Sequence, residues 1–397
     1  MNPAGPTQTP IRFAGYSRRK LVLGAACLQL MLSGCDGEAD ANQGPPKISF
    51  VTFNTALIAQ TENLTQRLDA IVNDIPNTNA DVVCLQELWE PEQLKEVASK
   101  LRGTFPYSHW SVSAGEVIAG CDAKESDSLL GCLATACSNA ASTGMTKCAV
   151  ANCANAFTQV STACQNCVMN HQTLAPSEIG TECALSSVNT TAYQDQSGIL
   201  LLSKYPLKSK DYLRLESSFG DRGVLAASIE SKALSSTDVY CTHLVATQTD
   251  IDYPGTHGSW SGERAVQIDA LTQFIKGKRS NDDSVVLMGD LNCGPEGNDV
   301  AGEDPDGFAR LIDSGLSADY VTKKSFECTF CADNPLVPSS SPSLMLDHVL
   351  FSNLPKNLSQ NAQRIFGRPI TIQVDGKPVE TMHSDHYGFE LTLDSEN

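Results

Sequence analysis

Polar side chains that could bind a metal ion or transfer a proton stand where the apolar segments of this 397-residue chain begin or end. The apolar run VVLMG (285–289), for example, is followed by Asp290 and, two positions later, by Asn292. Carboxylate and amide oxygens are ligands of hard divalent cations, and a histidine beside a carboxylate can act as a general base. The residues that share this position are Asn54, Glu87, His243, Asp290, Asn292, Asp347, Asp385 and His386. One such residue is usually part of a turn, but repetition at several strand ends favours a shared site.

The elements that would position these residues follow from the pattern of apolar and turn-forming residues. Short apolar segments bounded by turn signals predict strands at 47–54, 81–86, 107–112, 198–203, 223–230, 238–243, 284–289, 347–352 and 386–393, with a hairpin at 371–380. Helical periodicity predicts helices at 61–75, 91–101, 263–278 and 308–316.

The fold class that these elements favour is α/β: a four-layer sandwich of two packed, mainly antiparallel β-sheets flanked by helices, with a cysteine-rich helical insertion. Where neighbouring strands are antiparallel, the start of one lies beside the end of the other. Polar residues at strand ends and strand starts can therefore share one rim of the sandwich. We expect the catalytic domain in two parts, 47–115 and 191–397, on either side of the insertion.

The insertion, 116–190, differs from the rest of the chain because it contains eight cysteines and few large apolar residues. Its cysteines recur at intervals of 16 residues, as at Cys132, Cys148 and Cys164. Such a short Ala/Ser/Thr-rich repeat favours small helices held together by disulfides, since it cannot build a core alone. A zinc site at CQNC (164–167) is the alternative, although no second close pair of ligands accompanies it.

The first 34 residues (1–34) are typical of an export signal. The stretch SRRKLV places two arginines before the apolar run LVLGAACLQLML, as in twin-arginine signals. The run ends in LSGC, which resembles the cleavage box of bacterial lipoproteins and predicts lipidation of Cys35. An ordinary secretory signal with a chance cysteine is the alternative. Residues 35–46 would form a polar tether, which predicts a lipid-anchored protein of the bacterial cell envelope, periplasmic or on the outer surface.

Charge and cysteine content narrow the partners and the compartment. The net charge is −18, and it becomes about −22 if the first 34 residues, with four basic residues and no acid, are removed. Such a chain is a poor candidate for tight nucleic-acid binding. Fifteen cysteines indicate an oxidising compartment. Without Cys27 and Cys35 thirteen remain, so at least one of them is unpaired within the chain.

Cysteines of the catalytic domain allow two further predictions. Cys84 and Cys241 lie inside apolar strand segments and are expected to be buried thiols. Cys328 or Cys331 could bridge to Cys293, which directly follows Asn292, and such a bridge would brace the site.

The motifs at the strand ends resemble those of the endonuclease/exonuclease/phosphatase superfamily, which has the deoxyribonuclease I-like fold. They occur in the family order and are TFNT around Asn54, LQEL around Glu87, SGILLLSKYPL (197–207), THL around His243, GDLN (289–292), LDHVLFS (346–352) and SDHYGFELTL (384–393). The resemblance covers residues 47–397 except the cysteine-rich insertion.

Within this superfamily the chain looks most like the neutral sphingomyelinase and bacterial sphingomyelinase C branch. Arg264 stands on a helix as in that branch, Arg222 precedes a glycine on a strand, and Trp89 follows the metal-site glutamate. The insertion is foreign to the branch. The Trp-rich hairpin that secreted bacterial sphingomyelinases push into lipid is also missing before SDH, and a lipidated N-terminus could replace it.

The resemblance implies a bound Mg²⁺ ion, with Mn²⁺ or Ca²⁺ as alternatives. Glu87 would be the main metal ligand, Asn54 would lie beside it, and Asp385 would complete the metal side of the site. Cleavage of a phosphodiester requires a nucleophilic water, neutralised phosphate oxygens and a protonated leaving group. A hard cation bound by oxygen ligands suits the second requirement.

The resemblance also implies the catalytic roles. His386 would be the general base or the group that positions water, and Asp347 would orient its ring. Asp290 would contact the attacking water and Asn292 would hold the phosphate. His243 would donate to a non-bridging oxygen.

Three further residues, Arg222, Trp260 and Arg264, are expected to contact substrate. The implied function is a Mg²⁺-dependent phosphodiesterase that cleaves a phospholipid headgroup. Two alternatives are an extracytoplasmic metal-dependent nuclease and an anchored interaction lipoprotein with an inactive site, although every residue carried over from the family is present.

Overall fold

The computed structural model describes residues 46–58, 61–111, 120–140, 145–171, 174–184, 197–249, 252–278, 283–297, 299–323 and 326–395. The predicted signal peptide (1–34), the predicted lipidation site Cys35 and nearly all of the predicted tether (35–46) lie outside these residues.

The first sheet has six strands and combines segments from both ends of the described chain. Its strand order is β10 (Leu358–Ile365), β13 (Gly388–Ser395), β1 (Lys47–Asn54), β2 (Val82–Gln86), β4 (Leu200–Ser203) and β3 (Tyr107–His109). β1 and β2 run parallel, and the other neighbours are antiparallel. Both central strands are buried along almost their whole length, which explains their continuous apolar sequences.

The second sheet has five strands, and its order follows the sequence. The strands are β5 (Lys208–Leu215), β6 (Arg222–Glu230), β7 (Ser236–His243), β8 (Ser284–Asp290) and β9 (Asp347–Ser352). β7 and β8 run parallel, and the other neighbours are antiparallel. The predicted hairpin is present as β11 (Ile370–Val374) and β12 (Lys377–Thr381), and its Asp-Gly turn has both residues at positive φ.

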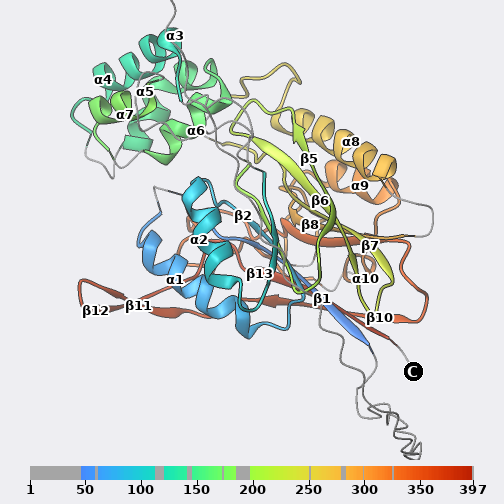
Figure 1. Cartoon of the computed structure of the whole chain (residues 1–397). Coiled ribbons are helices and arrows are strands. Elements are labelled where there is room, and N and C mark those ends of the chain that lie inside the picture. Colours follow the sequence, from blue (N-terminus) through green and yellow to red (C-terminus); the bar gives the residue numbers. More distant parts are fainter. Residues whose placement is uncertain are drawn as a thin grey trace, which may run out of the picture. The chain divides into compact units, whose positions relative to one another are not determined.

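The two sheets pack face to face over the larger apolar core. Alternate residues of β1 point to opposite faces, so Phe50 joins the core shared with the second sheet and Phe53 joins the core beneath the first pair of helices. The covering helices are α1 (Leu64–Asp74) and α2 (Pro91–Leu101) on the first sheet, and α8 (Trp260–Lys278) and α9 (Pro305–Asp313) on the second (Figure 1). Two short helices, η1 (Ile75–Asn77) and α10 (Asp319–Thr322), complete the domain. The predicted four-layer α/β sandwich is confirmed, with one parallel pair in each otherwise antiparallel sheet.

Two strands, β5 and β10, were not expected from the sequence. Their sequences, KSKDYLRL and LSQNAQRI, are largely polar, and both strands lie at sheet edges. An edge strand has a neighbour on one side only and commonly carries charged residues that prevent pairing with other chains. The apolar pattern that identified the buried strands is therefore absent from both.

The cysteine-rich insertion lies between β3 and β4 and is helical, as predicted. Its elements are α3 (Ala123–Glu125), the π-helical turn η2 (Ser126–Leu130), α4 (Gly131–Ala136), α5 (Met145–Thr158), α6 (Thr162–Asn170) and α7 (Pro176–Cys183). Four disulfides join them: Cys121–Cys164, Cys132–Cys153, Cys137–Cys148 and Cys167–Cys183. Both thiols of CQNC are thus used in separate disulfides, which removes the ligands of the alternative zinc site.

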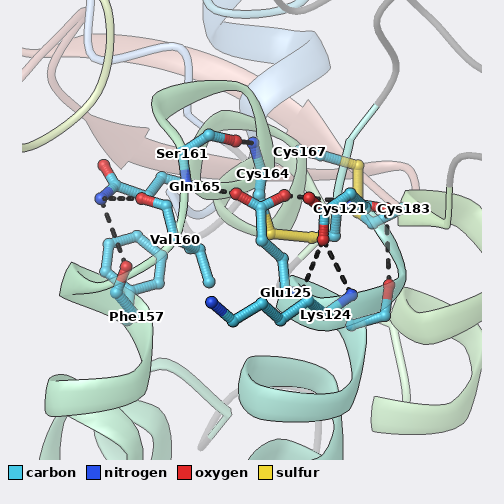
Figure 2. The surroundings of a disulfide bond; sticks show 12 residues. Cys121, Lys124, Glu125, Phe157, Val160, Ser161, Cys164, Gln165, Cys167 and Cys183 are labelled. Atoms are coloured by element: carbon cyan, nitrogen blue, oxygen red, sulfur yellow. Dashed lines mark hydrogen bonds between the residues drawn. A yellow bond between two sulfur atoms is a disulfide. The ribbon is translucent and has the colours of Figure 1, made fainter.

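The first of these disulfides fixes the start of α6 (Figure 2). Ser161 caps this helix by accepting from the Cys164 N–H, and its own N–H donates to Glu125 Oε1 at 2.6 Å. Gln165 Nε2 donates to the main-chain oxygen of Phe157 at 3.2 Å. Disulfides and capping bonds together hold a body whose apolar core consists mostly of cysteine and a few aliphatic side chains.

The cysteines of the catalytic domain differ from two predictions. Cys84 and Cys241 form a disulfide between β2 and β7 with a Cα–Cα distance of 5.4 Å, so the expectation of buried thiols is wrong. Both strands point these cysteines into the space between the sheets, where they meet. Cys328 and Cys331 bond to each other, so the expected bridge to Cys293 is also wrong.

Cys293 is a buried free thiol, as the odd number of cysteines required. The six disulfides fit a protein of an oxidising compartment. Among the described residues, none of the helices has the length and apolar character that a membrane crossing requires.

Candidate active site

The registers of neighbouring strands bring the polar strand ends together. His243 at the end of β7 pairs with Asp290 at the end of β8, and Asp290 pairs with Asp347 at the start of β9. β1 ends at Asn54, whose Nδ2 donates to Asp290 Oδ2 at 2.9 Å and to Glu87 Oε1 at 3.0 Å. Asn54 therefore connects the rims of the two sheets, and the polar groups of both sheets face one site.

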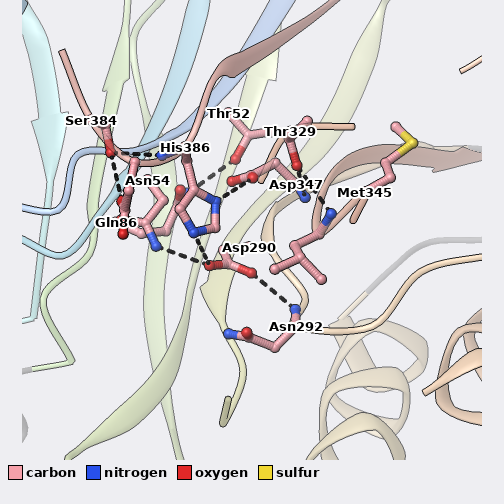
Figure 3. Close-up of polar contacts among 12 residues, drawn as sticks. Thr52, Asn54, Gln86, Asp290, Asn292, Thr329, Met345, Asp347, Ser384 and His386 are labelled. Atoms are coloured by element: carbon pink, nitrogen blue, oxygen red, sulfur yellow. Dashed lines mark hydrogen bonds and ion pairs between the residues drawn. The ribbon is translucent and has the colours of Figure 1, made fainter. Parts of the chain in front are cut away.

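His386 and Asp347 form a buried pair. His386 Nδ1 lies 2.7 Å from Asp347 Oδ2, and His386 Nε2 lies 3.9 Å from Asp290 Oδ2 (Figure 3). Thr329 Oγ1 accepts from the Asp347 N–H at 3.1 Å, and the Phe330 ring lies 5.2 Å from the His386 ring. Because Asp347 holds Nδ1, the ring presents Nε2 to the rest of the site.

The Arg222 guanidinium fixes the protonation of His243. Arg222 Nη1 lies 3.1 Å from His243 Nδ1, and a guanidinium can only donate, so Nδ1 must accept. The ring proton is then on Nε2, which lies 3.5 Å from Asp290 Oδ2. Burial and the positive charge of Arg222 lower the pKa of His243 well below its ordinary value, which keeps the ring neutral. The Trp89 ring lies 5.1 Å from the guanidinium carbon and packs against this pair.

Asp290 occupies the centre of these contacts. Its Oδ2 accepts from Asn54, and its Oδ1 accepts from the Asn292 N–H at 2.9 Å. Burial, followed by the charge of Asp347, raises the pKa of Asp290 to about 7. Burial would lower the pKa of His386, but the Asp347 and Asp290 carboxylates raise it well above its ordinary value. Asp290 and His386 therefore form a carboxylate–imidazole pair that can hold and pass on a proton.

Two residues at the site adopt a backbone conformation that is uncommon outside glycine. Glu87 has φ 61° and Asn292 has φ 48°. Glu87 directly follows the buried strand β2, and Asn292 lies two residues after the end of the buried strand β8. Asn292 Nδ2 donates to the Leu244 main-chain oxygen at 2.9 Å. Such backbone strain concentrates at functional sites.

The chemistry of the donor groups fits a divalent cation on one side of the site. Glu87 lines the cavity, and its pKa is raised first by burial and then by the charge of Asp385. Two adjacent carboxylates with an amide, Asn54, beside them are the oxygen ligands that Mg²⁺ prefers.

A second group of potential ligands, Asp290, Asp347 and His386, has ligand atoms within 4.8 Å of one another. His386 Nδ1 and Asp347 Oδ2 are hydrogen-bonded to each other. A metal in this group could use these two atoms only if that bond broke. The side of the site that carries Glu87 and Asp385 could also hold a metal.

A cavity of about 560 Å³ opens onto these groups. Its polar end is lined by Glu87, Arg222, His243, Asp290, Asn292 and His386. The remaining wall is mostly apolar, with Trp89, Phe219, Phe330, Leu344 and Leu346 from the catalytic domain and several residues from the insertion. The volume is that of a small-molecule site with a few convergent polar groups.

Two residues expected to contact substrate do not line this cavity. Arg264 is fully buried and donates to Asp304 Oδ2 at 2.7 Å and to the Val245 main-chain oxygen at 2.9 Å. Trp260 is buried at the start of α8, with its ring edge-on to those of Phe219 and Tyr253. This placement does not support a substrate contact for either residue. Arg264 instead holds the segment that follows His243.

Three residues that contribute to the site were not predicted from the sequence. Thr329 and Phe330, which support Asp347 and His386, are the two middle residues of the CxxC motif, in a loop without apolar periodicity. Arg67 on α1 is buried and donates to the main-chain oxygens of Thr55 and His383, which ties the loop after β1 to the loop before Asp385. An arginine on a helix carries no sequence signal for such a role.

Comparison with known proteins identifies the family. The model of the endonuclease/exonuclease/phosphatase family matches residues 51–386, which is most of the chain and includes every polar strand end described above. The chain belongs to the endonuclease/exonuclease/phosphatase family. The predicted resemblance is thus confirmed, and endonuclease/exonuclease/phosphatase members are hydrolases that act on phosphodiester bonds.

Several solved structures share the fold of this chain. Sphingomyelinase C from Streptomyces griseocarneus is 17% identical, with 89% of this chain and 100% of that chain covered and a TM-score of 0.51. A magnesium-bound variant of beta toxin from Staphylococcus aureus is 16% identical, with 88% and 100% covered and a TM-score of 0.54. Truncated TDP2 from Caenorhabditis elegans is 13% identical, with 88% and 98% covered and a TM-score of 0.53. At this level of identity the likeness establishes the fold alone. No curated protein sequence matches the chain.

Proposed function

We propose that this endonuclease/exonuclease/phosphatase protein is a Mg²⁺-dependent phosphodiesterase that cleaves the headgroup phosphodiester of a phospholipid, in the manner of a sphingomyelinase C. The observation that carries the proposal is the cluster of Asn54, Asp290, Asp347 and His386 beside a cavity whose remaining wall is mostly apolar. Proton-transfer groups, phosphate-binding groups and an apolar wall are the three features that such a substrate needs.

The side chains divide the work of hydrolysis between them. His386, held by Asp347, and Asp290 face each other through Nε2 and Oδ2 and would orient the attacking water and take its proton. Glu87 and Asp385, with Asn54 beside them, would hold the cation. The cation supplies positive charge to the phosphate oxygens when it is bound.

Hydrogen-bond donors would stabilise the negative charge that develops on the phosphate oxygens during hydrolysis. His243 carries its proton on Nε2 because Arg222 occupies Nδ1, so the ring can donate to a non-bridging oxygen. Arg222 lines the same cavity and adds a permanent positive charge. Asn292 faces the cavity beside Asp290, in position to hold a phosphate oxygen.

The character of the cavity wall favours a lipid over a nucleic acid. Among the described residues that line it, Arg222 is the one arginine or lysine, whereas apolar and aromatic side chains are numerous. A nuclease site extends into basic surface that follows the phosphate backbone. The strongly negative net charge of the chain agrees with the lipid assignment. The predicted lipid on Cys35 would hold the enzyme at the membrane surface on which such a substrate lies.

The experiment offers purified protein with Mg²⁺ two kinds of substrate in parallel: vesicles that contain sphingomyelin and phosphatidylcholine, and supercoiled plasmid DNA. His386→Gln serves as the inactive control. Phosphocholine release by the wild-type protein, without nicking of DNA and without release by the variant, is the expected result. Nicking of DNA without phosphocholine release would replace the proposal with a nuclease. Absence of both reactions from a folded protein would leave an anchored interaction protein with an inactive site.

A further inference from the structure

Two chemically different sets of side chains line the cavity, and they come from different parts of the chain. Catalytic side chains from the strand ends form the first set. The cysteine-rich insertion contributes only uncharged side chains to the wall. Ala149, Ala154 and Phe157 are partly exposed, whereas Leu133, Val168 and Ile179 are buried. The insertion is therefore part of the active-site cavity rather than an appendage distant from it.

Polar contacts fix the insertion to the segment that leads into β6. Gln165 on α6 accepts from the Gly220 N–H at 2.9 Å and donates to the Ser218 main-chain oxygen at 3.3 Å. Thr162 Oγ1 donates to Asp221 Oδ1 at 2.8 Å. Gln165 and Asp221 are both buried, so these bonds are shielded from water.

Aromatic packing adds to this attachment. The Phe157 ring of α5 lies 5.5 Å from the Phe219 ring, and both residues line the cavity. The segment that carries Phe219 continues directly into Arg222 at the polar end. The apolar wall and the phosphate-binding arginine are thus held in a fixed relation to each other.

We propose that the insertion binds a hydrocarbon chain of the substrate while the phosphodiester lies at the catalytic strand ends. This inference rests on the proposed phosphodiesterase function and names its substrate class: an amphipathic phosphodiester with at least one long alkyl or acyl chain. The six insertion side chains offer no hydrogen-bond partner, so a ribose or a base lying against them would leave its polar groups unsatisfied. A hydrocarbon chain gains free energy from the same contact.

The test measures how activity depends on chain length in solution. Alkyl 4-nitrophenyl phosphates, from methyl to octyl, are supplied as monomers with Mg²⁺, and release of 4-nitrophenolate gives kcat/KM. Each methylene that the insertion wall removes from water should raise kcat/KM by roughly fourfold. We expect the ratio of the octyl to the methyl value to exceed 100, because several methylenes reach the wall.

Two variants on α5 distinguish the effect of blocking the cavity wall from the effect of altering the insertion elsewhere. Ala154→Phe places a ring into the apolar end of the cavity and should reduce the octyl-to-methyl ratio at least tenfold. Ala151→Phe adds the same ring to an exposed position of α5 outside the cavity and should retain both the wild-type ratio and the wild-type activity. Ala149→Phe repeats the blocking experiment if Ala154→Phe fails to fold. A wild-type ratio near one, or an unchanged ratio in both blocking variants, would overturn the inference.

A binding measurement distinguishes failure of this inference from failure of the proposed function. Decylphosphocholine below its critical micelle concentration is titrated calorimetrically into each protein in EDTA, where no turnover is expected. Binding by the wild-type protein and by Ala151→Phe, but not by Ala154→Phe, supports the chain-binding wall even if no phosphodiester is hydrolysed. Equal binding by all three proteins, or binding by none, contradicts it even if methyl 4-nitrophenyl phosphate is a good substrate.

Discussion

The disulfide between the two sheets should contribute a large part of the stability of this fold. Cys84 on β2 and Cys241 on β7 are separated by 157 residues in sequence. The closed ring is shorter, because Cys121–Cys164 bypasses 43 of these residues and Cys167–Cys183 bypasses 16, which leaves about 100. In the chain-entropy description a ring of about 100 residues stabilises the native state by about 4.7 kcal/mol.

The perturbation is Cys84→Ala/Cys241→Ala, and the assay is equilibrium unfolding in urea followed by tryptophan fluorescence. We expect the free energy of unfolding to fall by about 4 to 5 kcal/mol. Cys293→Ala is the control, since it removes a buried sulfur without opening a ring. A loss in the double variant no larger than in this control would refute the reasoning, because ring closure would then contribute nothing.

Three further predictions concern catalysis and pH. Asp347→Asn should lower kcat by about 10²–10⁴-fold with little change in secondary structure, because the carboxylate that orients the catalytic imidazole is lost. A kcat within threefold of the wild-type value would exclude that role. Burial lowers the pKa of His348 to about 4 in the folded state, so the unfolded chain takes up a proton at higher pH than the folded protein does. The free energy of unfolding should therefore fall by about 3 kcal/mol as the pH is lowered from 6.5 towards 4. Urea unfolding should show this loss for the wild-type protein and less of it for His348→Gln. The double variant Cys328→Ala/Cys331→Ala should lower kcat/KM by about 10- to 100-fold, because the segment that carries Phe330 is no longer held against His386. Unchanged kinetics in this variant would show that the disulfide is dispensable for catalysis.

The buried strands could be predicted from the sequence, because burial of a strand requires apolar residues within that strand itself. Central strands such as β8 must be apolar because both faces are covered, and β8 ends at a polar residue, Asp290. The position of those polar ends was also predictable, because strand direction and register bring His243, Asp290 and Asp347 to one rim. The same reasoning failed for the edge strands β5 and β10, whose polar sequences resemble loops.

Features that depend on how separate elements pack against one another could not be predicted from the sequence. Cys84 and Cys241 each fit a buried strand, but only the way the two sheets pack places their sulfurs within bonding distance. Arg264 stands on the expected helix, but its guanidinium donates to Asp304 and does not line the cavity. The contribution of the insertion to the cavity wall likewise depends on contacts made by Gln165.

The most direct test of the account is the metal dependence of hydrolysis in Glu87→Gln. Bis(4-nitrophenyl) phosphate, which needs no lipid surface, is supplied to metal-free protein while Mg²⁺ is titrated. Glu96→Gln, an exposed change on α2, is the matched control. The account predicts saturable activation by Mg²⁺ in the wild-type protein and in the control, with activation lost or shifted to at least tenfold higher Mg²⁺ in Glu87→Gln. The same activation curve in all three proteins would contradict a cation held at the rim of the two sheets.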